Sequence, residues 1–118
     1  MRSAYTWLRI VEVTAIPISA LLALYVLSGY GMVSPGVTSV LGFTYRFSTY
    51  VHSHPVLRYL TTVLVAAHGC GGFMLLVSRY VRKPILKHAL SAAALVYAVV
   101  LLTVSTLVEL ALMLGMPR

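Results

Sequence analysis

Acidic residues are almost absent from this 118-residue chain, whose two carboxylate side chains are Glu12 and Glu109. Charged residues of either sign make up 9% of the sequence, whereas about a quarter of a soluble domain is charged. A soluble chain of this length buries only about two-thirds of its surface on folding. Because 60% of the residues are hydrophobic, the composition argues against a soluble globule and indicates one membrane-embedded domain over residues 1–118.

Cysteine is also scarce, since Cys70 is the single one in the chain. One cysteine excludes an intrachain disulfide and a metal site built from several thiolates. The sequence has no Cys-x-x-Cys-His motif, which excludes the usual covalent attachment of a c-type haem. Cys70 falls inside an apolar run, where a small packing residue is the expected role.

Long uncharged runs are abundant, by contrast. Glu12 is the only formal charge between residues 10 and 32, and residues 59–78 and 89–108 contain none. A membrane-spanning helix needs about 20 mostly apolar residues. The first run is too long for the core of a signal peptide and no clear cleavage signal follows it, so we expect it to be retained. The sequence therefore predicts an all-α integral membrane protein with three transmembrane helices, running up-down-up, at about residues 8–32, 56–78 and 85–114.

The positive charges flank these runs. Lys and Arg number nine against two acids, which gives a net charge of +7. Their position beside the spans favours a membrane role over nucleic-acid binding. The N-terminus and the second connection share one side, and that side holds six of the cations. The positive-inside rule then predicts an N-in/C-out protein in the cell (plasma) membrane. Glu12 follows Arg9 by one turn and is expected to pair with it. The cations are Arg2, Arg9, Arg79, Arg82, Lys83 and Lys87 on the inner side, and Arg46, Arg58 and Arg118 on the outer side.

The connection over residues 33–55 is the irregular part of the sequence. It contains turn residues, among them Pro35, Gly36 and Gly42. It is also rich in aromatic residues, which favour the boundary between water and lipid. We expect a short interfacial segment on the outer face, as an anchor or as the lip of a binding site.

His68 lies near the middle of the second run, where an ionisable residue is a functional candidate. An imidazole in hydrocarbon must form a hydrogen bond, pair with a charge or bind a metal. Gly71 and Gly72 follow it by three and four residues and so share its face. Their missing side chains leave a flat slot, which Leu64 and Val65 border, and a haem held by an axial histidine requires such a slot. The alternatives are a histidine that bonds to a neighbouring helix across a close glycine contact, and a proton-transfer residue.

No second histidine lies at this depth. His88 begins the third run within the basic cluster, whereas His52 and His54 lie about 20 Å or more from His68 along a helix. A second axial ligand for a haem at His68 would therefore come from another chain, either a second anchor subunit or a further copy of this one. The catalytic residues of an enzyme are not evident, and we expect the chain to be non-catalytic alone.

The segment from His68 to Pro84 resembles the haem-ligating helix of the small membrane-anchor subunits of succinate dehydrogenase and fumarate reductase. His68 and Gly72 match the His-x-x-x-Gly of that family, and Tyr80 matches the tyrosine of its Asp-Tyr pair, with Arg79 in place of the Asp. The resemblance covers roughly residues 56–110. It implies a haem b shared between two anchor chains, a quinone site near Tyr80, and iron–sulfur and flavoprotein subunits on the inner face.

The residues Arg79 and Tyr80, at the inner end of the second run, each allow two interpretations. Arg79 follows His68 by eleven residues and lies about 20° from its stripe, where it could contact a haem propionate or act as a topogenic arginine. Tyr80 is a possible quinone contact or a member of the aromatic belt. The sequence favours an anchor subunit of a succinate:quinone oxidoreductase-type complex. A non-haem structural subunit of another respiratory complex and a small self-associating transporter or channel are the alternatives.

Overall fold

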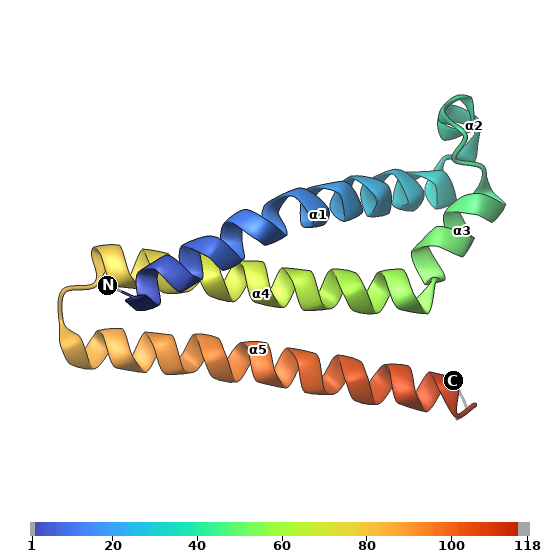
Figure 1. Ribbon diagram of the computed structural model, residues 1–118. Coiled ribbons are helices and arrows are strands. Elements are labelled where there is room, and N and C mark those ends of the chain that lie inside the picture. Colours follow the sequence, from blue (N-terminus) through green and yellow to red (C-terminus); the bar gives the residue numbers. More distant parts are fainter. Residues whose placement is uncertain (1, 116–118) are drawn as a thin grey trace.

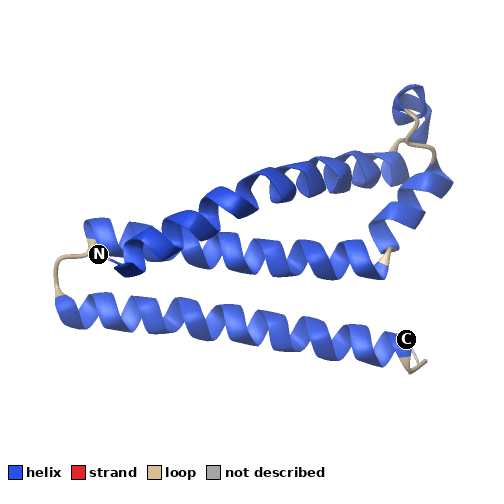
Figure 2. Cartoon of the chain, in the orientation of Figure 1, coloured by secondary structure: helices blue, strands red, loops and turns tan. Residues whose placement is uncertain are grey.

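A computed structural model describes the backbone of residues 2–115 and the side chains of residues 4–115. Arg118 and the side chain of Arg2, two of the predicted topogenic cations, lie outside the described part. Within residues 2–115 the chain is almost entirely helical and contains no strand (Figure 2).

Three long helices make up most of the fold: α1 (Arg2–Val33), α4 (Pro55–Tyr80) and α5 (Pro84–Met113). All three are long and apolar enough to cross a membrane. The prediction of an all-α chain with three such helices is therefore confirmed. α1 begins at Arg2 rather than near residue 8, while the other predicted boundaries differ by one or two residues.

Proline sets the start of two of these helices. Pro55 and Pro84 occupy the first turn of α4 and α5, where the missing backbone N–H would have no helical partner. Only residues 81–83 separate α4 from α5, and so short a connection places the two helices side by side.

α4 lies between α1 and α5 and packs against both (Figure 1). The helices form a layer rather than a closed bundle, because α1 and α5 pack on α4 instead of on each other. Few apolar side chains are buried as a result, and none of the residues of α5 is. Outward-facing apolar side chains suit a lipid environment, which is as apolar as the side chains themselves. The buried apolar residues are Ile18, Val51, Ala66, Met74 and Val77.

The connection between α1 and α4 is more ordered than the sequence indicated. It folds into α2 (Pro35–Thr38), a 3-10 turn η1 (Ser39–Leu41) and α3 (Tyr45–Ser53). Gly42 ends the 3-10 turn with a φ of 84°, which favours glycine. α3 packs against α1, where the absence of a side chain at Gly31 admits the Ser48 side chain.

Candidate functional site

His68 lies near the midpoint of α4 and faces α1. Its Nδ1 lies 2.9 Å from Oγ1 of Thr14, a residue 54 positions earlier in the chain. The same Thr14 hydroxyl donates to the carbonyl oxygen of Ile10 at 2.6 Å. A hydroxyl has one proton to donate, so when Thr14 donates to the Ile10 carbonyl it accepts from the imidazole, and Nδ1 then carries the hydrogen.

This hydrogen bond decides what the other ring nitrogen can do. When Nδ1 is protonated in a neutral imidazole, Nε2 carries the lone pair that binds a metal or accepts a proton. Among the described residues, Nε2 of His68 is neither hydrogen-bonded nor buried. The chain thus orients His68 through Nδ1 and leaves Nε2 without a protein partner among the described residues. Metal-binding histidines commonly have their other ring nitrogen fixed in this way.

The glycines around His68 have different environments. A Cβ at Gly71 would lie 3.1 Å from Cγ2 of Val11 and 3.4 Å from the Trp7 carbonyl oxygen, so residues of α1 already occupy the space beside Gly71. A Cβ at Gly72 or Gly69 would meet nothing within 4 Å. Of the two glycines predicted to form a slot, Gly71 therefore makes a helix contact, and Gly72 leaves space beside the imidazole.

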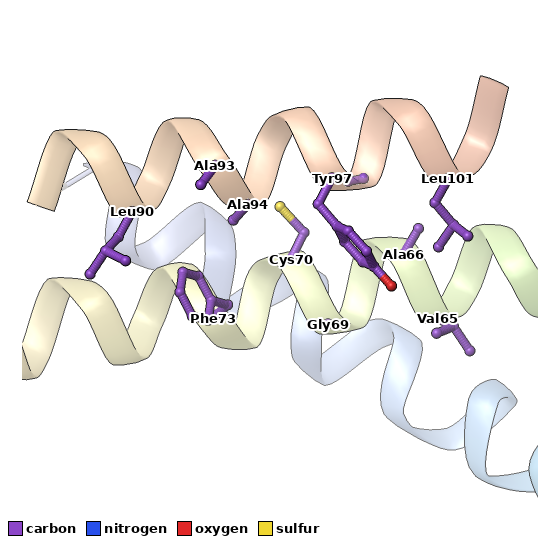
Figure 3. Close-up of a pocket in the computed structure, with 11 residues that line it drawn as sticks. Val65, Ala66, Gly69, Cys70, Phe73, Leu90, Ala93, Ala94, Tyr97 and Leu101 are labelled. Atoms are coloured by element: carbon purple, nitrogen blue, oxygen red, sulfur yellow. The ribbon is translucent and has the colours of Figure 1, made fainter. Parts of the chain in front are cut away.

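The aliphatic residues predicted to border the slot lie on the preceding turn of α4. Leu64 is half-buried, whereas Val65 is exposed. Val65 also lines a pocket of about 420 Å³ between α4 and α5, together with residues such as Gly69, Cys70 and Tyr97 (Figure 3). Cys70, expected to be a packing residue, is half-buried with its sulfur directed toward α5.

Arg79 and Tyr80 end α4 on its exposed surface. The guanidinium carbon of Arg79 lies 5.6 Å from the centroid of the Tyr80 ring, a geometry in which the cation is attracted to the ring face. Arg79 has no carboxylate partner among the described residues. Its charge is therefore free to meet an anionic group at this end of the helix layer.

A second imidazole, not predicted from the sequence, is held in the same manner near the end of α1. Nδ1 of His52 lies 3.0 Å from Oγ of Ser28, which donates to the Tyr25 carbonyl oxygen at 3.0 Å. Thr14 and Ser28 lie about 21 Å apart along α1 and within about 40° of the same stripe. The signal available in the sequence was this pair of hydroxyls at one face of a helix.

His54 differs from the other two, because its Nδ1 is buried and has no hydrogen-bond partner among the described residues. Its ring contacts that of Tyr50 with the centroids 5.4 Å apart. His54 also forms the cap before α4. The sequence predicts that His52 and His54 lie far from His68, and in the structure the two rings contact Tyr25, Ser28 and Tyr50 instead.

Both acids are paired with arginine. Glu12 lies 3.8 Å from Arg9 on exposed surface, which confirms the predicted pair. Glu109 of α5 accepts two bonds from Arg58 of α4, at 2.6 and 2.8 Å. A bidentate guanidinium–carboxylate pair of this kind is among the stronger polar contacts, and it joins the start of α4 to the end of α5.

The described residues contain no group of three or more His, Cys, Asp and Glu side chains that could hold a metal ion. Any metal at His68 would therefore have fewer than three such protein ligands from the described part of this chain. Comparison of the sequence and structure with protein-family models, curated proteins and solved structures finds no match.

Proposed function

We propose that this chain is a membrane-anchor subunit of a respiratory succinate:quinone oxidoreductase-type complex and that His68 is an axial ligand of a haem b. The observation that carries the proposal is the His68–Thr14 hydrogen bond of 2.9 Å, which leaves Nε2 with its lone pair free. The bare surface at Gly72 supports it, because a macrocycle must lie close to the helix that holds its iron.

Each residue of the site has a defined task under this proposal. Thr14 fixes the tautomer and the ring plane of His68, and Gly72 leaves room beside the imidazole. Arg79 supplies a cation for a propionate, and Tyr80 supplies a hydroxyl for a quinone at the same end. A bound haem contributes one-electron redox chemistry; the chain itself binds, orients and excludes water. The second axial ligand comes from a second anchor chain or another copy.

The orientation in the membrane follows from the cations and belongs to the same proposal. Arg9 and the cations around residues 79–87 lie at the end of the layer where α1 begins and α4 meets α5 (Figure 1). We assign this end to the inside of the plasma membrane. Iron–sulfur and flavoprotein subunits then dock at this basic end.

The alternative function is a structural subunit without haem, in which His68 only ties α4 to α1. The same 2.9 Å hydrogen bond favours it, since a bond between helices satisfies a polar side chain in the membrane. The two functions differ at Nε2, which binds iron in the first and nothing in the second.

The deciding experiment compares His68→Ala with His88→Ala in the complex purified from its native membrane. His88 is exposed at the start of α5, which makes it a control for loss of an imidazole. We expect His68→Ala to abolish or strongly reduce the haem detected as a pyridine haemochrome, and His88→Ala to retain it. An unchanged Soret band in His68→Ala, or a wild-type complex without any haem, would leave the structural alternative in place.

A further inference from the structure

A dense group of positive charges lies where α4 connects to α5. The last turn of α4, the connection at residues 81–83 and the first turn of α5 all contribute to it. Because only three residues join two helices that are each long and apolar enough to cross a membrane, these charges cannot rise far from the membrane surface. The group, which we call the basic turn, consists of Arg79, Arg82, Lys83 and Lys87.

The basic turn has no side-chain carboxylate to neutralise it, because both such groups in the chain are paired with other arginines. The side chains of Arg82 and Lys83 are exposed and make no hydrogen bond or ion pair within the described residues. Nζ of Lys87 donates to the Ser78 carbonyl oxygen at 3.4 Å, which leaves its charge in place. Four like charges within nine residues repel one another, so an anionic partner from outside the chain stabilises the turn.

Apolar surface adjoins these charges on the side of the membrane interior. Leu76 precedes Arg79 by three residues and Tyr80 by four, so the three side chains share one face of α4. Leu76 is 57% exposed and Tyr80 is 69% exposed. A ligand that fits this surface has an anionic head for the cations and an apolar chain for the leucine below them. A phospholipid offers both at this depth, whereas a soluble acidic protein offers the anion alone.

We propose that the basic turn binds an anionic phospholipid, with the headgroup phosphate at Arg82 and Lys83 and an acyl chain along Leu76. The guanidinium of Arg82 donates parallel N–H groups to phosphate oxygens, and Lys83 adds a second charge beside it. Each cation of this kind at a membrane surface strengthens the binding of anionic lipid about fivefold. The inference goes beyond the proposed function, since it requires neither a haem nor a partner subunit.

Energy transfer from Trp7 tests this binding. Trp7 is the single tryptophan of the chain, and it lies near the start of α1, at the same end of the helix layer as the basic turn (Figure 1). The full chain is reconstituted in phosphatidylcholine nanodiscs that contain a small fraction of either pyrene-labelled phosphatidylglycerol or pyrene-labelled phosphatidylcholine. The ratio of the two transfer efficiencies measures the preference for the anionic headgroup. Both leaflets have the same composition, so the result does not depend on the orientation of the chain.

We expect the wild-type chain to prefer phosphatidylglycerol and Arg82→Gln to lower that preference about fivefold. Arg82→Lys keeps the charge and should retain most of the preference. The matched control is Arg46→Gln in α3, which removes an exposed cation without a hydrogen bond or ion pair among the described residues, far from the basic turn, and should leave the preference unchanged. Added salt should weaken the preference of the wild type, because exposed charges are screened.

Three results would overturn the proposal. The first is equal transfer to both labelled lipids in the wild-type chain. The second is a preference that Arg82→Gln and Arg46→Gln lower to the same extent, since binding would then follow net charge and not the basic turn. The third is an unchanged lipid preference in Arg82→Gln together with loss of soluble subunits from the purified complex, which would assign the basic turn to a protein partner.

Discussion

At the scale of single residues, side chains of the same type have different neighbours in the fold and therefore different roles. His68 and His52 are each oriented by a hydroxyl of α1, at 2.9 and 3.0 Å, whereas Nδ1 of His54 is buried with no hydrogen-bond partner in the described part of the chain. Gly71 is covered by α1 while Gly72 faces open space. These differences depend on which helix lies beside each residue, and the chemistry of the site rests on them.

Thr14 is the residue whose change tests the orientation of His68. Thr14→Val keeps the shape of the side chain and removes the oxygen that accepts from Nδ1. If His68 binds iron, we expect the affinity for haem to fall by about 10–100-fold, the usual effect of losing such an orienting partner. Titration of the haem-free complex with haemin measures it.

Thr14→Ser serves as the control, since it retains a hydroxyl at the same position. The expected order of haem affinity is wild type, Thr14→Ser and then Thr14→Val. Equal affinity in all three would show that the bond to Thr14 has no part in ligation and would favour a role in helix packing alone.

At the scale of secondary-structure elements, α5 is joined to the layer by few polar contacts. Arg58 donates to both oxygens of Glu109, and the Tyr59 hydroxyl lies 2.8 Å from that of Thr106. These contacts lie in the first half of α4 and the second half of α5. Elsewhere the two helices leave the pocket of about 420 Å³ between them.

The Arg58–Glu109 pair is best tested by a double-mutant cycle. Glu109→Leu leaves the guanidinium without its acceptor, and we expect a loss of about 1–3 kcal/mol in the free energy of unfolding in micelles. Arg58→Met is the reciprocal change. The double variant should recover part of the loss, because neither charge is then unpaired. Strictly additive losses would mean that the pair makes no net contribution to the packing of α5.

The contact between α1 and α3 depends on Gly31. Gly31→Ala would place a Cβ against the side chain of Ser48 and near the Phe43 carbonyl oxygen, and overpacking of this kind costs about 1–3 kcal/mol. We expect α3 to open more often and chymotrypsin to cleave the segment faster at its aromatic residues. Gly36→Ala is the matched control, since its added methyl group meets nothing within 4 Å, and its cleavage rate should stay at the wild-type value.

At the scale of the whole molecule, the sequence predicts the fold class better than it predicts how the helices pack against one another. Apolar runs and their flanking cations were sufficient to place three helices long enough to span a membrane, because helix length and hydropathy are local properties. The partner of His68 was not predictable, since Thr14 lies 54 residues away and the register between α1 and α4 is set by packing. For the same reason, Gly71 and Gly72 could not be distinguished.

The short helices between α1 and α4 were not predicted, for a different reason. α3 has nine residues, and its amphipathic pattern is shorter than a periodicity argument needs. Its start did have a signal in the sequence, because the Thr44 side chain accepts from the Phe47 backbone N–H at 3.4 Å as an N-cap. A hydroxyl residue before a short aromatic run is therefore a stronger signal for the start of a helix here than the turn residues around it are for a loop.

The orientation of the whole chain is the last property to test. We predict that the connection between α1 and α4, residues 34–54, faces away from the cytoplasm and that the basic turn between α4 and α5 faces it, because six of the nine cations belong to the inner side in this arrangement. Val37 and Ile85 are exposed at opposite ends of the layer, at 73% and 85%. On the Cys70→Ser background, a membrane-impermeant maleimide should label Val37→Cys in intact cells. It should label Ile85→Cys only after permeabilisation, since that residue lies at the start of α5 beside Lys83.

The reverse labelling pattern would invert the topology, and the basic end would then be unable to receive partner subunits from the cytoplasm. Labelling of both sites in intact cells would indicate mixed insertion, which would contradict the single predicted topology.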